Sequence, residues 1–238
     1  MISFIIPVLN EEKIIEKTLK WISEYDGAKE IIISDGRSTD KTIEIAKKYT
    51  DKIVVYSGTI RQTISDARNL GASVATGDYL VFIDADVSIK NPNEFFKTAL
   101  NYFKENSKMV AVTGYIKVLP EYETLADKVI FTCFNYMWIF VSNVLHIGAA
   151  FGEFQLIKTD VFRKLTGYDK KHIGGEDHEM FRRLARVGRT FYSTELMVYH
   201  TGRRAHKTGW PKLLFNWALA ALPPCLQKIF LGEWKVIR

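Results

Sequence analysis

Three short apolar runs in the first ninety residues each stop at acidic side chains, and this pattern restricts the fold strongly. The runs and the residues after them are 2–9 before Asn10-Glu11-Glu12, 31–34 before Asp35-Gly36, and 79–83 before Asp84-Ala85-Asp86. Continuous apolar runs of this length are typical of strands that helices cover on both faces. Helical patterns separate the runs, the first of them over residues 11–24, and this favours parallel strands joined by right-handed crossovers. The sequence therefore predicts an α/β fold with a mostly parallel central sheet flanked by helices.

The two carboxylates of Asp84 and Asp86 are two residues apart, so an extended backbone points them to the same side. Two anionic groups placed together are costly unless a cation lies between them. An isolated Asp-x-Asp is more often a turn or a helix cap. Here three strands end in carboxylates, and ligands of open α/β sheets bind at the carboxyl ends of the strands. This repetition favours a site for a polar, metal-bound ligand.

Length and composition fit one ordinary globular domain. The chain has 238 residues, of which 47% are hydrophobic and 25% charged. Its two cysteines, Cys133 and Cys225, belong to no metal-binding cluster, which argues against a zinc site or a disulfide scaffold and favours a reducing compartment. The first residues already form a core strand, so no signal peptide is expected. We therefore expect a cytoplasmic protein.

The net charge of +6 is concentrated near the C-terminus. The charged residues of this segment are Arg203, Arg204, Lys207, Lys212, Lys228, Lys235 and Arg238, against Glu233. Tryptophan and leucine residues, including Trp210, Trp217 and Trp234, alternate with them, which is more typical of a membrane-surface segment than of a nucleic-acid site. A C-terminal helix packed on the domain, with its basic side chains in water, explains the pattern equally well.

A second apolar segment, 129–151, contains no charged residue and is long enough to span a bilayer. Polar residues such as Asn135 and His146 interrupt it, and the chain has no other segment of this kind. These interruptions favour a helix that is buried against the domain or lies in the membrane interface.

Seven short motifs occur in order along the chain. They are Pro7-Val8-Leu9-Asn10-Glu11, the segment 34–40, Ala67-Arg68-Asn69-Leu70-Gly71, Gly77-Asp78, Asp84-Ala85-Asp86, Gly167-Tyr168-Asp169 and Gly175-Glu176-Asp177. Together they resemble the family 2 glycosyltransferases of the GT-A fold across nearly the whole chain. The resemblance implies an inverting, hexosyltransferase-type enzyme that uses a nucleotide-sugar donor and Mn²⁺ or Mg²⁺. It also suggests a nucleotide-sugar-binding half (1–118), an acceptor and catalytic half (119–205), and a basic amphipathic extension (206–238).

The resemblance assigns ligand-binding roles to residues along the whole chain. Those expected at the nucleoside and sugar are Pro7, Leu9, Glu11, Asp35, Arg68, Asp84 and Ala85. Those expected at the diphosphate and its metal ion are Asp84, Asp86, His200, Arg203 and Arg204. His200 could equally be a strand-end histidine whose hydrogen bonds are satisfied within the protein.

Transfer to a hydroxyl also needs a group that accepts the proton of the acceptor. Asp177 is the preferred general base and Glu176 the second catalytic candidate. They follow Gly174-Gly175 and precede an amphipathic helix, and their register with the other motifs of the resemblance favours a catalytic role. The two carboxylates could instead complement the positive end of that helix. A lipid-phosphate acceptor is already ionised and would need no base, so Asp177 would then only position it.

Two other functions remain open from the residues alone. A nucleotidyltransferase shares the sheet and the metal-binding aspartates, but the acidic segment 7–12 lacks a glycine-rich, basic phosphate loop. A non-catalytic module that binds nucleotide sugars at a membrane is the second alternative. For the transferase we expect a UDP-sugar slightly ahead of a GDP-sugar. Its acceptor is expected to be lipid-linked or a glycan near the cytoplasmic face of a membrane.

Overall fold

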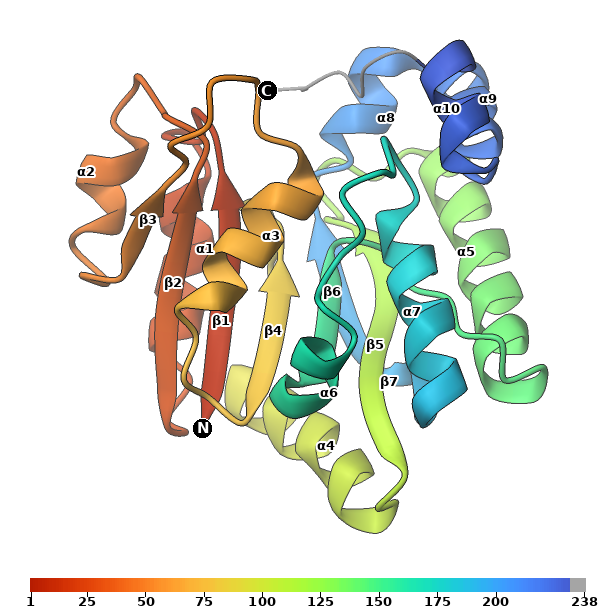
Figure 1. The fold of residues 1–238 in the computed structure, drawn as a ribbon, viewed down its shortest axis with the longest axis horizontal. Helices are drawn as coiled ribbons and strands as arrows, with labels where there is room; N and C mark the ends of the chain where they lie inside the picture. Colours follow the sequence, from red (N-terminus) through yellow and green to blue (C-terminus); the bar gives the residue numbers. More distant parts are fainter. Residues whose placement is uncertain (232–238) are drawn as a thin grey trace.

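A seven-stranded sheet forms the centre of the computed structural model, which describes residues 1–231 (Figure 1). The strands follow the spatial order β3-β2-β1-β4-β6-β5-β7. Their bounds are β1 Ile2–Val8, β2 Lys29–Asp35, β3 Ile53–Val55, β4 Tyr79–Ile83, β5 Met109–Val118, β6 Phe154–Lys158 and β7 Arg189–His200. Only β6 runs antiparallel to its neighbours, β4 and β5. The prediction of a mostly parallel sheet is confirmed.

Helices cover both faces of the sheet. Their bounds are α1 Ile15–Ser23, α2 Thr42–Ala46, α3 Ile64–Ser73, α4 Pro92–Glu105, α5 Leu125–Ile139, α6 Thr159–Lys164, α7 Glu176–Val187, α8 Arg203–Thr208, α9 Trp210–Ala220 and α10 Pro224–Phe230, with a π-helical turn η1 at Phe140–Val144. Helices α1 and α4 lie on one face, and α3, α6 and α7 on the other (Figure 1). Each face of the sheet therefore has its own apolar core.

Strand β4 shows why the sequence forms a doubly covered sheet. Val81 and Ile83 join the core beneath α1 and α4, whereas Leu80 and Phe82 join the core beneath α3, α6 and α7. All four side chains are completely buried. Successive side chains of a strand point to opposite faces, so an uninterrupted apolar run is what two buried faces require.

The first helix begins later than the apolar pattern predicts. Helical spacing runs from Glu11, but α1 starts at Ile15. The backbone N–H of Glu11 donates to Thr42 Oγ1 at 2.7 Å, and that of Glu12 donates to Asp40 Oδ2 at 3.1 Å. These bonds hold residues 11–14 as a loop at the carboxyl end of β1, where Glu11 faces the site described below.

The apolar segment 129–151 forms most of α5, the turn η1 and a following loop. Asn135 fastens α5 to the sheet, because its buried amide donates to Ile116 O at 2.8 Å and accepts from the backbone N–H of Ile116 and the hydroxyl of Tyr192. The opposite side of α5 is exposed, with Tyr136 and Val129 more than half accessible. Among residues 1–231, none of the helices combines the length and the apolar character needed to cross a membrane.

Helices α8 and α9 contact α5, and α10 packs against α9 (Figure 1). Asp127, at the start of α5, joins them, because its carboxylate accepts from His206 Nε2 at 2.7 Å and from Trp210 Nε1 at 2.9 Å. Both partners belong to the predicted C-terminal extension. The last part of that extension, with Glu233, Trp234, Lys235 and Arg238, lies outside the described residues.

Candidate active site

One cavity of about 900 Å³ opens at the carboxyl ends of the central strands. Twelve of the thirteen predicted site residues line it: Pro7, Leu9, Glu11, Arg68, Asp84, Ala85, Asp86, Glu176, Asp177, His200, Arg203 and Arg204. They come from β1, α3, β4, α7, β7 and α8 and from the loops that follow these strands. The topology thus gathers residues that are far apart in the sequence into one chamber.

Asp35 is the predicted site residue that does not line this cavity. Its buried carboxylate accepts hydrogen bonds from the backbone N–H groups of Arg37 and Ser38, at 3.1 and 3.0 Å, and from the Ser38 hydroxyl at 2.6 Å. The side chain therefore fixes the turn after β2, and its neighbour Gly36 reaches the cavity. A direct contact between Asp35 and a nucleobase stays a prediction.

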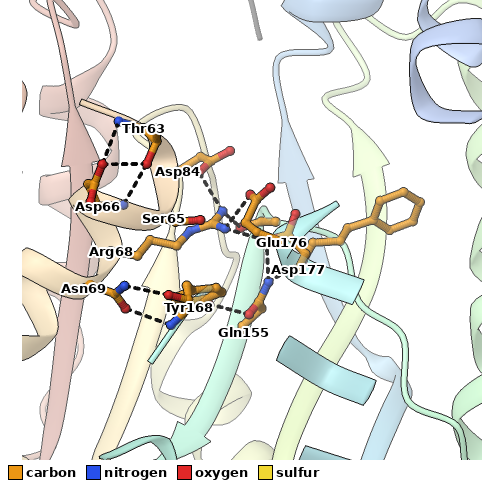
Figure 2. A network of polar contacts seen from close by, with 12 residues as sticks. Thr63, Ser65, Asp66, Arg68, Asn69, Asp84, Gln155, Tyr168, Glu176 and Asp177 are labelled. Carbon is orange, nitrogen blue, oxygen red and sulfur yellow. Dashed lines mark hydrogen bonds and ion pairs between the residues drawn. The ribbon is translucent and has the colours of Figure 1, made fainter. Parts of the chain in front are cut away.

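Arg68 is the hub of the polar network (Figure 2). It lies on α3, only 2% of it is exposed, and its guanidinium donates to Glu176 Oε1 at 3.0 Å and to Asp177 Oδ1 at 2.5 Å. Asp84 Oδ1 lies 3.7 Å away, and the carbonyl of Gly152 accepts a further bond. Because a buried guanidinium is stable only with such partners, Arg68 and the two carboxylates of α7 fix one another.

Asp177 is held in one orientation at the start of α7. Its Oδ1 accepts from both Arg68 and Gln155, and the Gln155 amide is in turn held by the Tyr168 hydroxyl at 2.6 Å (Figure 2). Gly175, just before the helix, has φ +74° and passes so close to Ala220 that a Cβ would lie 2.8 Å from its carbonyl oxygen. The second oxygen, Oδ2, accepts no hydrogen bond from residues 1–231 and can therefore accept a proton.

Several carboxyl groups of the cavity hold their protons more tightly than usual. Burial, together with neighbouring carboxylates, raises the pKa of Asp84 to about 7 and that of Glu153 to about 7. Burial and the adjacent Asp177 raise the pKa of Glu176 to about 8. Arg68 opposes these increases without removing them. Because burial is the largest cause of each increase, these carboxyl groups are partly protonated near neutral pH, and a bound cation would favour their ionised forms.

The residues predicted to hold a metal ion, Asp84, Asp86 and His200, all line the cavity. Within residues 1–231 no three His, Cys, Asp or Glu side chains converge to form a complete metal site. However, the buried Nε2 of His200 has no hydrogen-bond partner in this part of the chain. Burial lowers the pKa of His200, which favours the neutral imidazole that binds metals. Mg²⁺ in proteins commonly binds one or two carboxylates together with phosphates of the substrate. Asp84 and Asp86 therefore fit an ion that would also bind the phosphates of a nucleotide sugar.

Arg203 links the C-terminal segment to the first strand. Its guanidinium makes two bonds to the carboxylate of Glu11, at 2.6 and 2.9 Å, and its Nε lies 3.4 Å from Asp86 Oδ2. Asp86 also accepts a hydrogen bond from Thr201. Arg203 is therefore a direct neighbour of Glu11, which is expected at the nucleoside, and of Asp86, the second aspartate of the Asp-x-Asp motif. Arg204 lines the same cavity.

Two functional candidates in and next to β6 escaped the sequence reasoning. Glu153 lies 3.8 Å from His200 Nδ1, and Gln155 orients Asp177. Glu153 immediately precedes β6 and Gln155 lies within it, so both polar side chains come from the same end of this strand. Polar residues at alternate positions of the apolar segment 151–157 were the available signal. Asp84 and Asp86, in contrast, lie in a turn after β4, where the Val87 N–H donates to Asp84 O at 3.2 Å, so the extended backbone expected for them is wrong.

Comparison with known proteins agrees with this geometry. Residues 3–166 match the family model described as glycosyl transferase family 2. The chain belongs to glycosyltransferase family 2. Its sheet, with flanking helices and a site at the strand ends, is the GT-A arrangement predicted from the motifs.

Relatives within glycosyltransferase family 2 differ in substrate. The chain is 28% identical to a 4,4'-diaponeurosporenoate glycosyltransferase of Staphylococcus haemolyticus, covering 99% of this chain and 66% of the relative. It is 30% identical to a dolichyl N-acetyl-alpha-D-glucosaminyl phosphate 3-beta-D-2,3-diacetamido-2,3-dideoxy-beta-D-glucuronosyltransferase of Methanococcus voltae, covering 84% and 67%.

A solved structure has the same fold. The mannosyltransferase of Pyrobaculum calidifontis, in complex with GDP-mannose and Mn²⁺, superposes with a TM-score of 0.73 at 18% identity, covering 99% of this chain and 65% of that one. The chain thus spans about two thirds of the length of all three relatives.

Proposed function

We propose that the chain transfers a sugar from a nucleoside-diphosphate sugar to an acceptor hydroxyl, with inversion at the anomeric carbon. The observation that carries the proposal is the single cavity shared by Glu11, Asp86 and Asp177. The residues proposed to bind the nucleoside, to bind the diphosphate and to accept the proton of the acceptor therefore line one cavity, as a direct displacement requires. Family membership and the named activities of the relatives support the same reaction.

In this reaction the bond between the anomeric carbon and the diphosphate oxygen breaks while the acceptor oxygen bonds to the opposite face of that carbon. Asp177 accepts the hydroxyl proton of the acceptor at Oδ2, and Arg68 and Gln155 hold its other oxygen in place. Arg204 and Arg203 offset the charge that develops on the leaving diphosphate. An acceptor phosphate would arrive already ionised, and Asp177 would then position it.

A divalent ion, Mn²⁺ or Mg²⁺, fits the proposal. Asp86, Asp84 and His200 would hold it, and when bound it supplies a Lewis acid for the departing diphosphate. The GDP-mannose and Mn²⁺ complex of the Pyrobaculum enzyme supports this assignment by similarity of fold.

The proposed acceptor is lipid-linked or lies close to a membrane, at its cytoplasmic face. Apolar side chains on α5, η1, α9 and α10 are more than half exposed: Leu125, Val129, Tyr136, Phe140, Val144, Phe215, Ile229 and Phe230. Exposed lysines on α5, α9 and α10 accompany them: Lys128, Lys212 and Lys228. An apolar face with basic residues suits peripheral contact with anionic lipids.

A thermal-shift panel of UDP- and GDP-sugars, with and without Mn²⁺, tests the donor assignment. UDP-sugars are our first choice, and the GDP-sugars are included because the Pyrobaculum enzyme was solved with GDP-mannose. We expect one donor to raise the melting temperature only when Mn²⁺ is present, and Asp86→Asn to abolish that increase. If no donor shifts the transition under either condition, the proposed transferase function is wrong.

The membrane assignment needs its own measurement. Co-sedimentation with vesicles that contain phosphatidylglycerol should retain the protein, and Phe140→Asp should release it. Full transfer to a soluble sugar without detergent, together with no vesicle binding, would contradict this part of the proposal.

A further inference from the structure

Part of the cavity, next to Asp177, is lined by apolar side chains. On one side it is lined by Phe134, Trp138 and Val141 of α5 and η1, and on the other by Trp217 and Ala221 at α9. Residues 134, 138 and 141 are spaced as one face of a helix, and so are 217 and 221. Two helices thus present matching apolar stripes to the same space, which we call the apolar channel.

Aromatic rings form a continuous wall along this channel. The ring centroids of Phe134 and Trp217 lie 5.2 Å apart in an edge-to-face arrangement, and this pair connects α5 with α9. Trp138 lies 4.3 Å from the ring of His178, which is the residue after the proposed base. The Phe134–Trp217 contact therefore closes one side of the apolar channel, and Trp138 brings its aromatic lining next to the residue after Asp177.

The inner end of the channel contains two polar atoms without partners. Trp138 Nε1 and His178 Nδ1 are buried and form no hydrogen bond with any group of residues 1–231. Buried polar atoms in folded proteins nearly always have partners, because an unpaired one costs stability. Burial also lowers the pKa of His178 to about 4, so its ring is neutral and can accept as well as donate. An indole donor and a neutral imidazole side by side suit the polar head of a bound molecule.

The outer end of the channel opens on the exposed apolar face. Ile147 lines the cavity and is also 48% exposed, and Ala221 on the other side is exposed as well. Phe140 and Val144, on the same stretch of chain, are more than half exposed. The cavity lining therefore includes apolar residues at the protein surface as well as beside Asp177, and the charged residue Arg182 lines the same cavity.

We propose that the apolar channel binds a long apolar chain or ring system carried by the acceptor, with the polar head of the acceptor turned toward Trp138 and His178. This inference rests on the proposed function, because it assigns the channel to the acceptor of that reaction. It specifies an amphiphilic acceptor whose reacting oxygen lies at Asp177. A purely polar sugar would leave the aromatic side chains of the apolar channel without an apolar partner.

The test uses cis-parinaric acid, a fluorescent long-chain polyene acid, as the binding probe. We expect saturable binding with energy transfer from tryptophan. Ala221→Phe should fill the channel and weaken binding at least about tenfold, the factor that corresponds to about 1.4 kcal/mol. Trp138→Phe keeps an aromatic ring but removes the N–H donor, so it should weaken binding to a smaller extent. Phe215→Ala, on the exposed side of α9 and outside the cavity lining, is the matched control and should bind normally.

Two outcomes would overturn the inference: absence of saturable probe binding, or equal affinities for wild type, Ala221→Phe and Trp138→Phe. Equal losses in Ala221→Phe and Phe215→Ala would assign the probe to the outer surface and would also refute the channel. The Mn²⁺-dependent donor shift is measured on the same variants. A donor shift without channel binding refutes only this inference, whereas channel binding without a donor shift refutes the proposed function.

Discussion

Glu153→Gln should change the pH dependence of stability in a direction that the cavity dictates. Glu153 is mostly buried, and its pKa is raised from 4.5 to about 7, chiefly by burial and then by Asp177 and Asp86. Between these two values the folded state binds more protons than the unfolded state, so the free energy of unfolding falls as the pH rises. Above about pH 7 the loss is complete. Glutamine does not titrate, so the Glu153→Gln variant does not lose this free energy of unfolding as the pH rises.

The size of the effect follows from the raised pKa. Because the pKa of Glu153 is 4.5 when unfolded and about 7 when folded, its ionisation lowers the free energy of unfolding by about 3 kcal/mol at about pH 8. At about pH 5 the reduction is less than about 1 kcal/mol. A chain of 238 residues has an unfolding entropy near 0.5 kcal/mol per degree, taking about 2.1 cal/mol/K for each residue. The melting temperature of Glu153→Gln relative to wild type should therefore increase by about 5 °C between these pH values.

Calorimetry in the presence of EDTA measures this difference without interference from bound metal. Glu94→Gln, an exposed change on α4, controls for the loss of a surface charge. Parallel melting curves of wild type and Glu153→Gln from about pH 5 to about pH 8 would refute the reasoning. Such curves would mean that Glu153 ionises in the chamber as readily as it does in the unfolded chain.

Three further changes test the remaining parts of the site. Asp177→Asn should bind the donor normally but slow transfer to a hydroxyl acceptor by at least about a hundredfold, and undiminished turnover would remove the base assignment. Arg204→Ala should weaken donor binding by calorimetry through lost contact with the diphosphate, and an unchanged affinity would count against that contact. Arg68→Met should destabilise the fold by about 3–5 kcal/mol in urea unfolding, because Glu176 and Asp177 lose their buried partner. Adding Glu176→Gln should restore part of that stability, and a further loss would show that Arg68 acts by packing instead.

The sheet was predictable because local pattern determines it. Strand β4 is apolar on both faces and stops at Asp84, so its burial follows from the alternation of side chains alone. The positions of Asp86 and Glu11 do not, because a turn follows β4 and a loop follows β1. The predicted start of α1 was wrong. Residues 11 and 12 form tertiary hydrogen bonds to the loop after β2, and helical spacing in the sequence does not indicate such bonds.

The catalytic side of the site was less accessible to sequence reasoning. Strand β6 runs antiparallel between β4 and β5, and this insertion is what places Glu153 and Gln155 beside Asp177. Nothing local in segment 151–158 indicates its neighbours in the sheet. The face of α5 that packs on the sheet was equally hidden, because apolar residues lie on nearly every side of the helix. Only Asn135 distinguishes the face that packs on β5, and it does so through bonds to Ile116.

The C-terminal helices α8 and α10 contact the surroundings of the site at two places. Arg203, in α8, pairs with Glu11 at the nucleotide side. Gln227, in α10, accepts from the backbone N–H of Ile173 at 2.8 Å and donates to the carbonyls of Ala220 and Leu222. It thereby connects the end of α9 to the loop that leads into Asp177. Because one segment touches both the donor and the acceptor sides, movement of α8–α10 would change both at once, and the apolar channel can form only while α9 remains against α5.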